Sequence, residues 1–346
     1  MWLLDKIHAV FDAGLHYLKL IEDRQVGWLT LDRKSGDFKR EQQSLWKKLK
    51  LLLLFNPVME WIDRTHALRL WTHKKNISAD AEQNFAGQRM GTPQSHAQIK
   101  AFVDFYHIDM GAFEPSDPES YPTFEDFFVR KFAPNARPIF ARGDPTKAIA
   151  VADSRAVVYQ TVEKTRALWI KGSRFTIENL IKDGKRSDKW RNGPVASFRL
   201  SPQDYHRYHS PVKGKVKWYK HIAGDYLQVD PVALHSSVNI LTENARGCVC
   251  IESEDFGDVL FVAIGATDVG TVEIHDEIKQ KGHSVQKGDE LGLFQFGGSS
   301  IIVAFEQGRI EFDDDLERFS NQEVMVDVEV GMSLGKATRP RVPKPR

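Results

Sequence analysis

A series of short apolar runs, most of them separated by glycine or proline, begins at about residue 148 and limits what the chain can fold into. Runs of this length that are bounded by turn residues are typical of strands packed on a hydrophobic core. We therefore expect the main body of the protein to be rich in β-strands. The runs cover residues 148–151, 157–162, 167–170, 216–218, 249–251, 259–264, 271–274, 301–305 and 324–330.

Two helices are predicted ahead of this β-rich body, at residues 98–106 and 124–132. Both segments have apolar side chains at helical spacing, and in the second one Phe124, Phe127 and Phe128 fall on one stripe. Helices followed by many strands indicate the α+β class, with N-terminal amphipathic helices packed on a β-rich catalytic core.

Residues 1–95 differ in composition from the rest of the chain. They contain five of the eight tryptophans, and residues 46–75 hold seven Lys or Arg against two acidic residues. Aromatic, leucine-rich and basic helices are typical of the membrane interface, where cations approach anionic head groups. We expect a helical segment that lies on a membrane, or alternatively a pair of amphipathic helices that cap the main domain.

Composition sets further limits on location and partners. No apolar run reaches the roughly 18 residues that span a bilayer, and the N-terminal sequence lacks a signal-peptide core. The sequence therefore favours a peripheral membrane or cytoplasmic protein. The 48 Lys and Arg balance 47 Asp and Glu, so we expect no nucleic-acid partner. Residues 96–332 are predicted to be the main domain, and 333–346, basic and proline-rich, a frayed, solvated end.

The two cysteines, Cys248 and Cys250, cannot form a disulfide framework. Their spacing of two residues places both side chains on one face of a strand. We expect them to be buried as small apolar side chains, which fits a reducing compartment.

Three separated motifs carry side chains suited to nucleophilic catalysis. Gly298 and Ser299 stand just ahead of an apolar strand, where glycine permits a strained turn and the serine hydroxyl can attack the preceding carbonyl. His206 and His209 lie three residues apart in a polar, aromatic stretch, and Asp153 ends an apolar run. Aspartate, histidine and serine together form the arrangement that activates a hydroxyl.

Each motif alone has an ordinary structural interpretation: a tight turn, two structural histidines, a polar strand end. A metal site is not expected, because no third His or Cys lies at a recognised zinc spacing.

The combination resembles the pyruvoyl-dependent phosphatidylserine decarboxylases, over about residues 95–330 and with the motifs in the same order. Any one of these motifs is weak, but six in order are specific. They lie at residues 124–130, 134–139, 152–155, 171–180, 200–211 and 287–300.

The resemblance implies a self-cleaving proenzyme, cut between Gly298 and Ser299, whose two chains, 1–298 and 299–346, stay together. Ser299 becomes the pyruvoyl group, which forms a Schiff base with the substrate amine, so that neither a metal nor pyridoxal phosphate is needed. By the same resemblance His209, oriented by Asp153, deprotonates Ser299. His206 is the acid that protonates the carbanion after decarboxylation.

The substrate implied by the resemblance is phosphatidylserine, which would place the protein in phospholipid biosynthesis. Asp230 and Asp268 stand where the family more often has other residues, and a carboxylate beside a phosphodiester is unfavourable without a compensating cation. A free amino acid, such as tryptophan or ibotenate, is therefore the alternative substrate. We take Asp230, Asp268 and Ser300 as candidate substrate-binding residues.

Overall fold

The computed structural model describes residues 29–40, 90–168, 175–224, 240–266, 272–295 and 299–338. The interfacial helices predicted within residues 1–95 fall mainly in 1–28 and 41–89, outside the described residues. No helix among the described residues is long and apolar enough to cross a membrane.

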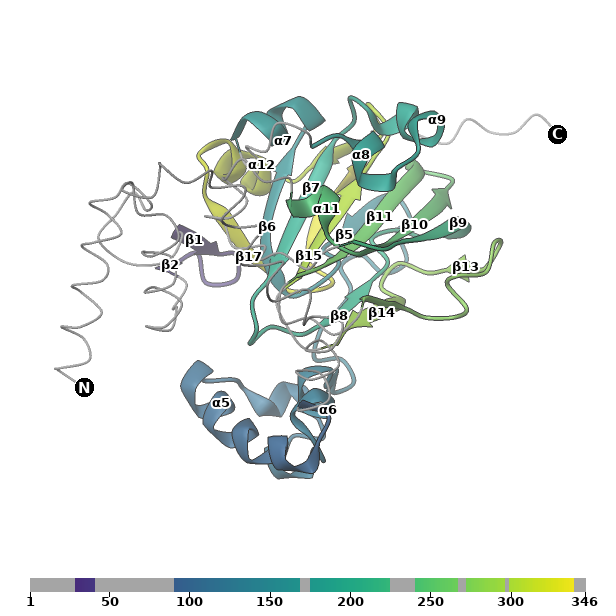
Figure 1. Ribbon diagram of the computed structural model, residues 1–346. Coiled ribbons are helices and arrows are strands. Elements are labelled where there is room, and N and C mark those ends of the chain that lie inside the picture. Colours follow the sequence, from purple (N-terminus) through teal and green to yellow (C-terminus); the bar gives the residue numbers. More distant parts are fainter. Residues whose placement is uncertain are drawn as a thin grey trace, which may run out of the picture.

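A large, mainly antiparallel sheet is the centre of the fold (Figure 1). Its strands within the described residues are β1 (Leu29–Asp32), β2 (Phe38–Arg40), β6 (Ser154–Tyr159), β7 (Val195–Leu200), β9 (Gly214–Ile222), β10 (Arg246–Ser253), β11 (Gly257–Gly265), β13 (Ser284–Val285), β15 (Ser299–Ala304) and β17 (Met325–Val328). They lie in the order β13-β9-β10-β11-β15-β7-β6-β17-β1-β2, so that β15 is an inner strand.

Three smaller sheets in the described part of the chain accompany the large one. The first joins β12 (Val272–Ile274), β14 (Glu290–Phe294) and β8 (Arg207–His209); the second joins β16 (Ile310–Phe312), β18 (Ser333–Ala337) and β5 (Lys147–Ile149); the third joins β3 (Phe113–Glu114) and β4 (Lys131–Phe132).

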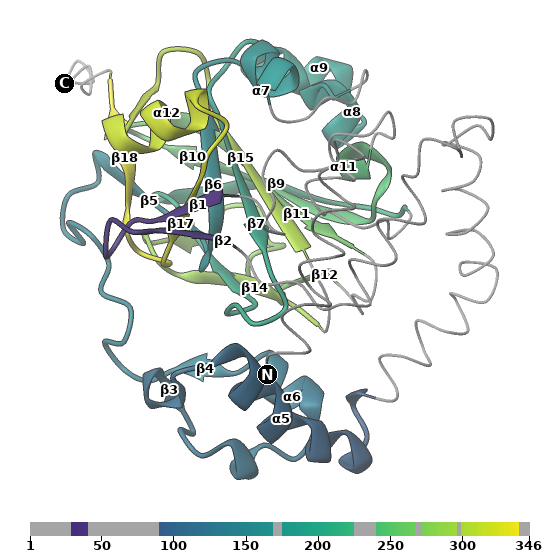
Figure 2. The same cartoon turned by 90° about the vertical axis from the view of Figure 1, so that its left-hand side faces the viewer.

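The helices gather at the two ends of the large sheet, with α5 and α6 at one end and α7, α8, α9 and α12 at the other (Figure 2). Their bounds are α5 (Ile99–Tyr106), α6 (Phe124–Phe128), α7 (Val162–Leu168), α8 (Ile177–Ile181), α9 (Gly184–Ser187), α11 (Ile240–Glu243) and α12 (Asp314–Asn321); short 3₁₀ turns are η2 (Pro93–Gln98), η3 (Met110–Ala112), η4 (Pro118–Ser120) and η5 (Asp188–Trp190).

Strand β15 is buried on both faces, because the sheet separates two hydrophobic clusters. Side chains alternate between the faces of a strand, so Ile301 and Val303 pack in one cluster and Ile302 and Ala304 in the other. Burial on both faces explains why this strand is a continuous apolar run rather than an alternating one.

A third, aromatic cluster forms around α5 and α6 at the end of the sheet where β7 ends. Thr123 begins α6 by accepting a hydrogen bond from the backbone N–H of Asp126. The predicted stripe of Phe124, Phe127 and Phe128 is buried in this cluster, which also includes Tyr205.

The α+β class and the β-rich core are confirmed, as is the burial of both cysteines, which lie in β10. Two boundaries are wrong. Residues 167–168, predicted as part of a strand run, close helix α7. The helix predicted over 124–132 ends at Phe128, and Lys131 and Phe132 instead pair with β3.

Two segments predicted to lie outside the core add strands to it. Residues 29–40, inside the segment predicted to be helical, form a hairpin whose β1 pairs with the edge of β17. Residues 333–337, predicted to be the start of a solvated end, form β18 between β5 and β16. In both cases neighbouring strands supply hydrogen bonds that the polar local sequence does not signal.

Arg33 fixes the hairpin to the start of α12, since its guanidinium contacts Asp313 at 2.8 Å and Asp315 at 2.7 Å. We expect Arg33→Met to lower the free energy of unfolding by about 1–3 kcal/mol, because it removes charge-assisted hydrogen bonds from a largely buried site. Urea unfolding measures the loss.

The matched control is Lys34→Met in the same hairpin, whose ammonium is 69% exposed and pairs with Glu329. An exposed pair contributes less than about 1 kcal/mol. Equal losses in the two variants would contradict the role given to Arg33.

Candidate active site

Ser299 is the first residue of β15, between Leu200 of β7 and Gly265 of β11. Its side chain is fully buried, and its hydroxyl has no hydrogen-bond partner among the described residues. Leaving a buried hydroxyl unpaired costs about 1–3 kcal/mol, and such exceptions mark strained or chemically active positions. Gly298, the other side of the predicted cleavage bond, lies outside the described residues.

His206 lies in the loop between β7 and β8, fully buried against the ring of Phe128, with 3.9 Å between ring centroids. Its Nδ1 is 2.8 Å from the backbone oxygen of Asp204. Because a carbonyl only accepts hydrogen bonds, this contact places the proton of the neutral ring on Nδ1 and leaves Nε2 as the basic nitrogen.

His209 ends β8, and a carbonyl fixes its ring in the same way. Nδ1 is 2.8 Å from the backbone oxygen of Gly288, and the hydroxyl of Tyr205 lies 3.2 Å from Nε2. Gly288 has φ +90°, and a Cβ there would lie 2.7 Å from Ile139 Cδ1, so this turn requires glycine.

The environment of His209 favours the neutral ring. Burial lowers the pKa of His209 below its ordinary value, although the hydrogen bond to Gly288 and the charges of Glu290 and Asp153 oppose the shift. A neutral imidazole with a fixed tautomer is suited to act as a base.

The carboxylate of Asp153 is held by two groups. Arg137 Nη2 lies 2.7 Å from Oδ2, and the backbone N–H of Val330 donates to Oδ1 at 2.8 Å. In this arrangement Asp153 acts on His209 through its charge, while Gly288 and Tyr205 contact the two ring nitrogens. The direct orientation of His209 by Asp153 stays a prediction.

The fold brings the histidine loop and the chain around Ser299 to the same end of the sheet. Leu200, the register partner of Ser299, leads directly into the loop that contains His206. The N–H of Phe294, at the end of β14, donates to the backbone oxygen of His206 at 2.8 Å. Strand β14, which ends five residues before Ser299, therefore ends beside the backbone of His206.

Of the candidate substrate-binding residues, Ser300 alone lies within the described ranges. Ser300 is buried in β15, on the opposite face of the strand from Ser299, beside Arg199 of β7. Asp230 and Asp268 lie outside the described residues. No group of three or more His, Cys, Asp or Glu within the described ranges could hold a metal.

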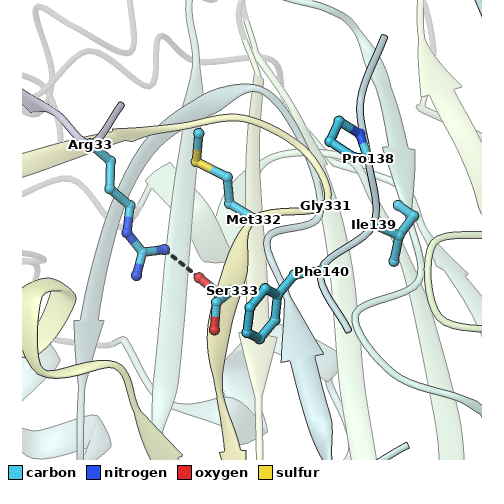
Figure 3. A pocket seen from close by; sticks show the side chains of 7 residues that line it. All are labelled: Arg33, Pro138, Ile139, Phe140, Gly331, Met332 and Ser333. Atoms are coloured by element: carbon cyan, nitrogen blue, oxygen red, sulfur yellow. Dashed lines mark hydrogen bonds between the residues drawn. The ribbon is translucent and has the colours of Figure 1, made fainter. Parts of the chain in front are cut away.

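A pocket of about 430 Å³ is formed by residues 138–140 and 331–333 together with Arg33 (Figure 3). Arg33 donates a hydrogen bond to the backbone oxygen of Ser333 at its rim. Its lining residues are Arg33, Pro138, Ile139, Phe140, Gly331, Met332 and Ser333, which include none of the predicted catalytic residues.

Sequence reasoning missed the residues that hold the predicted catalytic side chains: Arg137, Tyr205 and Gly288. All three lie inside motifs of the resemblance, which is the signal that could have found them. Their partners lie 16 residues away for Arg137, 4 for Tyr205 and 79 for Gly288. No local periodicity connects residues at such varied distances.

Comparison with known proteins gives a consistent result. Residues 124–336 match the family model described as phosphatidylserine decarboxylase. The chain is 43% identical to phosphatidylserine decarboxylase proenzyme 2 of Oryza sativa subsp. japonica, over 97% of this chain and 52% of that protein. It is 34% identical to proenzyme 3 of Schizosaccharomyces pombe, over 91% of this chain and 31% of that protein.

A bacterial relative is matched almost end to end. The phosphatidylserine decarboxylase proenzyme of Fusobacterium nucleatum subsp. nucleatum is 32% identical, over 88% of this chain and 96% of its own length. The rice and fission yeast relatives are longer, and the chain spans about half of the former and a third of the latter.

The lowered pKa of His209 predicts a pH dependence of stability. Above the ordinary pKa of 6.5 the ring is neutral in both states. As the pH falls through that value the unfolded chain takes up the proton first, so stability is lost until the lower pKa of the folded state is reached. We expect His209→Gln to lose less stability than the wild type between pH 7.5 and 5.5, by at most about 1.4 kcal/mol per pH unit.

Urea unfolding at both pH values measures this difference, with Ser299→Ala present in both proteins so that both are uncut single chains. The other histidines are common to both proteins and cancel in the comparison. Identical losses in wild type and variant would contradict the role of burial at His209.

Proposed function

Because the chain belongs to the phosphatidylserine decarboxylase family, we propose that it cuts itself between Gly298 and Ser299 and then decarboxylates an amino-acid head group. The observation that carries this proposal is the buried Ser299 hydroxyl, which has no hydrogen-bond partner among the described residues. A hydroxyl kept free of partners inside a sheet is available to attack the carbonyl that precedes it.

His209 is the proposed base for the cut. Its neutral ring presents Nε2, which Tyr205 releases when the serine proton is transferred. Ser299 Oγ then bonds to the carbonyl carbon of Gly298. The peptide C–N bond breaks as His209 returns the proton to the leaving nitrogen, which leaves an ester and a free amine. Asp153, fixed by Arg137, stabilises the imidazolium through its charge.

The ester is removed in two further steps. Loss of the Ser299 α-proton and cleavage of the Cβ–O bond release the new carboxyl end at Gly298 and leave dehydroalanine. Hydrolysis of its tautomer releases ammonia and leaves a pyruvoyl group at residue 299. The buried position of Ser299 fits this group, because the ketone stays out of bulk water beside Leu200 at the end of β7.

A pyruvoyl group supplies an electron sink for the pair released when carbon dioxide leaves a bound amino acid. His206 is the proposed acid that returns a proton to the α-carbon, and its Nδ1 is fixed by the Asp204 carbonyl so that Nε2 carries the exchange. The ring of Phe128 covers His206 and keeps water away. The names of the rice and bacterial relatives support phosphatidylserine as substrate and phosphatidylethanolamine as product.

The two proposed chains, 1–298 and 299–346, stay together because the second contributes β15 to the middle of the large sheet. Contact of residues 1–95 with a membrane surface is proposed as well, on the basic and aromatic composition of that segment.

Ser299→Ala should give a single uncut chain, because no hydroxyl is left to attack Gly298. Intact mass spectrometry of the wild type should show two chains, the smaller one lighter by one ammonia than its sequence. The matched control is Ser197→Ala, another buried serine, in β7, which should be cut normally. A cut Ser299→Ala protein that decarboxylates would overturn the pyruvoyl proposal.

Substitution of each histidine should affect a different reaction: His209 the self-cleavage and His206 the decarboxylation. We expect His209→Ala to remain uncut, and His206→Ala to be cut but to release carbon dioxide from phosphatidylserine micelles about 100-fold more slowly, the usual size of a lost proton transfer. Normal cutting of both variants would contradict the assignment. Release from free tryptophan but not from phosphatidylserine by the wild type would move the substrate to the alternative class.

A further inference from the structure

We propose that Arg130 is a positioning residue for His206, a role that rests on the proposed decarboxylation. Arg130 follows α6 and is 2% exposed. Its guanidinium lies over the rings of Phe113, at 4.3 Å, and Phe127, at 4.7 Å. A charge so deeply buried is costly unless it is paired or solvated by dipoles.

The hydrogen-bond partners of Arg130 are backbone carbonyls: Phe127 O of α6, 3.4 Å from Nη1, and two carbonyls of the histidine loop. Its Nη2 donates to Gln203 O at 2.8 Å and lies 3.4 Å from Asp204 O. No ion pair among the described residues includes Arg130, and its Nε has no hydrogen-bond partner there. Burial lowers the pKa of Arg130 to about 10, so the group stays charged at neutral pH.

The Asp204 carbonyl is the point at which Arg130 reaches His206. This oxygen accepts the hydrogen bond from His206 Nδ1, at 2.8 Å, and also lies 3.4 Å from Nη2 of Arg130. Arg130 therefore holds the direction of the carbonyl that decides which ring nitrogen of His206 carries the proton.

A second arginine links the same two segments, with its donor on β8 and its acceptor next to Arg130. Arg207, next to His206, donates from Nε to Val129 O at 2.8 Å. The Phe128 ring stacks on His206 itself. Three consecutive residues, 128–130, thus contact the loop through a ring, a carbonyl and a guanidinium, and together they fix the plane and the tautomer of His206.

This arrangement acts on the proposed proton return and not on the proposed cut. Within the histidine loop Arg130 contacts Gln203 and Asp204, whereas His209 is held by Gly288 and Tyr205. A small displacement of a reacting group costs up to about 100-fold in rate. Disturbing the Asp204 carbonyl should therefore lower kcat while the chain is still cut.

The test uses the full-length, self-cut protein and Arg130→Met, which keeps an unbranched side chain between the two rings but removes every donor. We expect complete cutting, a kcat on phosphatidylserine micelles lower by about 10- to 100-fold, and a KM close to that of the wild type. Arg130→Lys keeps the charge but offers a single ammonium, and its kcat should lie between that of the wild type and that of Arg130→Met.

A spectroscopic signature separates positioning from general loss of structure. In protein with ¹⁵N-labelled histidine, the His206 ring, assigned by comparison with His206→Ala, should show the Nδ1–H tautomer in the wild type and a mixture of tautomers in Arg130→Met. The control Arg33→Met, expected to be destabilised through its contacts with Asp313, Asp315 and Ser333, should keep wild-type kcat and the wild-type His206 signal.

Several outcomes overturn the inference. The inference is wrong if Arg130→Met keeps the wild-type kcat and the wild-type His206 signal. It is also wrong if the fraction of uncut Arg130→Met chain accounts for the whole loss of activity. If Arg130→Met does not accumulate as folded protein, the same readouts in Arg130→Lys decide. If the wild type is neither cut nor active, the proposed function fails, whereas the His206 tautomer still reports on Arg130.

Discussion

The pairing of β15 with β11 on one side and β7 on the other is the constraint on which the rest of the structure depends. All residues of this strand are buried, and its ladder runs from Ser299 to Ala304 on both sides. Removing β15 would leave backbone N–H and C=O groups of β7 and β11 buried without partners. Each such group costs about as much free energy as a lost hydrogen bond. A peptide bond before Ser299 can therefore break without separating the strand from the sheet, because residues 300–304 remain paired on both sides.

The parts of the fold that could be predicted from the sequence are those in which the spacing of apolar residues along one segment shows which side chains are buried. The apolar run of β15 and the stripe of Phe124, Phe127 and Phe128 needed no tertiary knowledge, because each buries a contiguous surface. Strand β8 was missed, since Arg207 and His209 are polar and gain their strand geometry from β14. The same holds for the hairpin 29–40 and for β18, whose hydrogen-bond partners come from sequence positions far away.

The candidate site shows the same division between chemistry and geometry. The candidate catalytic side chains, Ser299, His206, His209 and Asp153, could be proposed from the sequence because their types and order form known motifs. What holds them could not, because each contact is specific to the fold: Arg137 for Asp153, backbone carbonyls for both histidines. Contacts of this kind link backbone atoms to side chains across loops, and they leave no composition or spacing by which sequence alone would reveal them.

The two histidines are equivalent in tautomer but not in electrostatics, and this difference is the physical basis for giving them different roles. A carbonyl fixes Nδ1–H in both. His206 faces the Phe128 ring, whereas His209 is the register partner of Glu290. Arg207 and a second histidine, His275, hold that carboxylate at 2.6 and 2.8 Å. Its charge raises the pKa of His209 against the larger opposing effect of burial. A base that must give its proton back within one reaction needs this balance, because burial alone would leave the imidazolium too unstable to form.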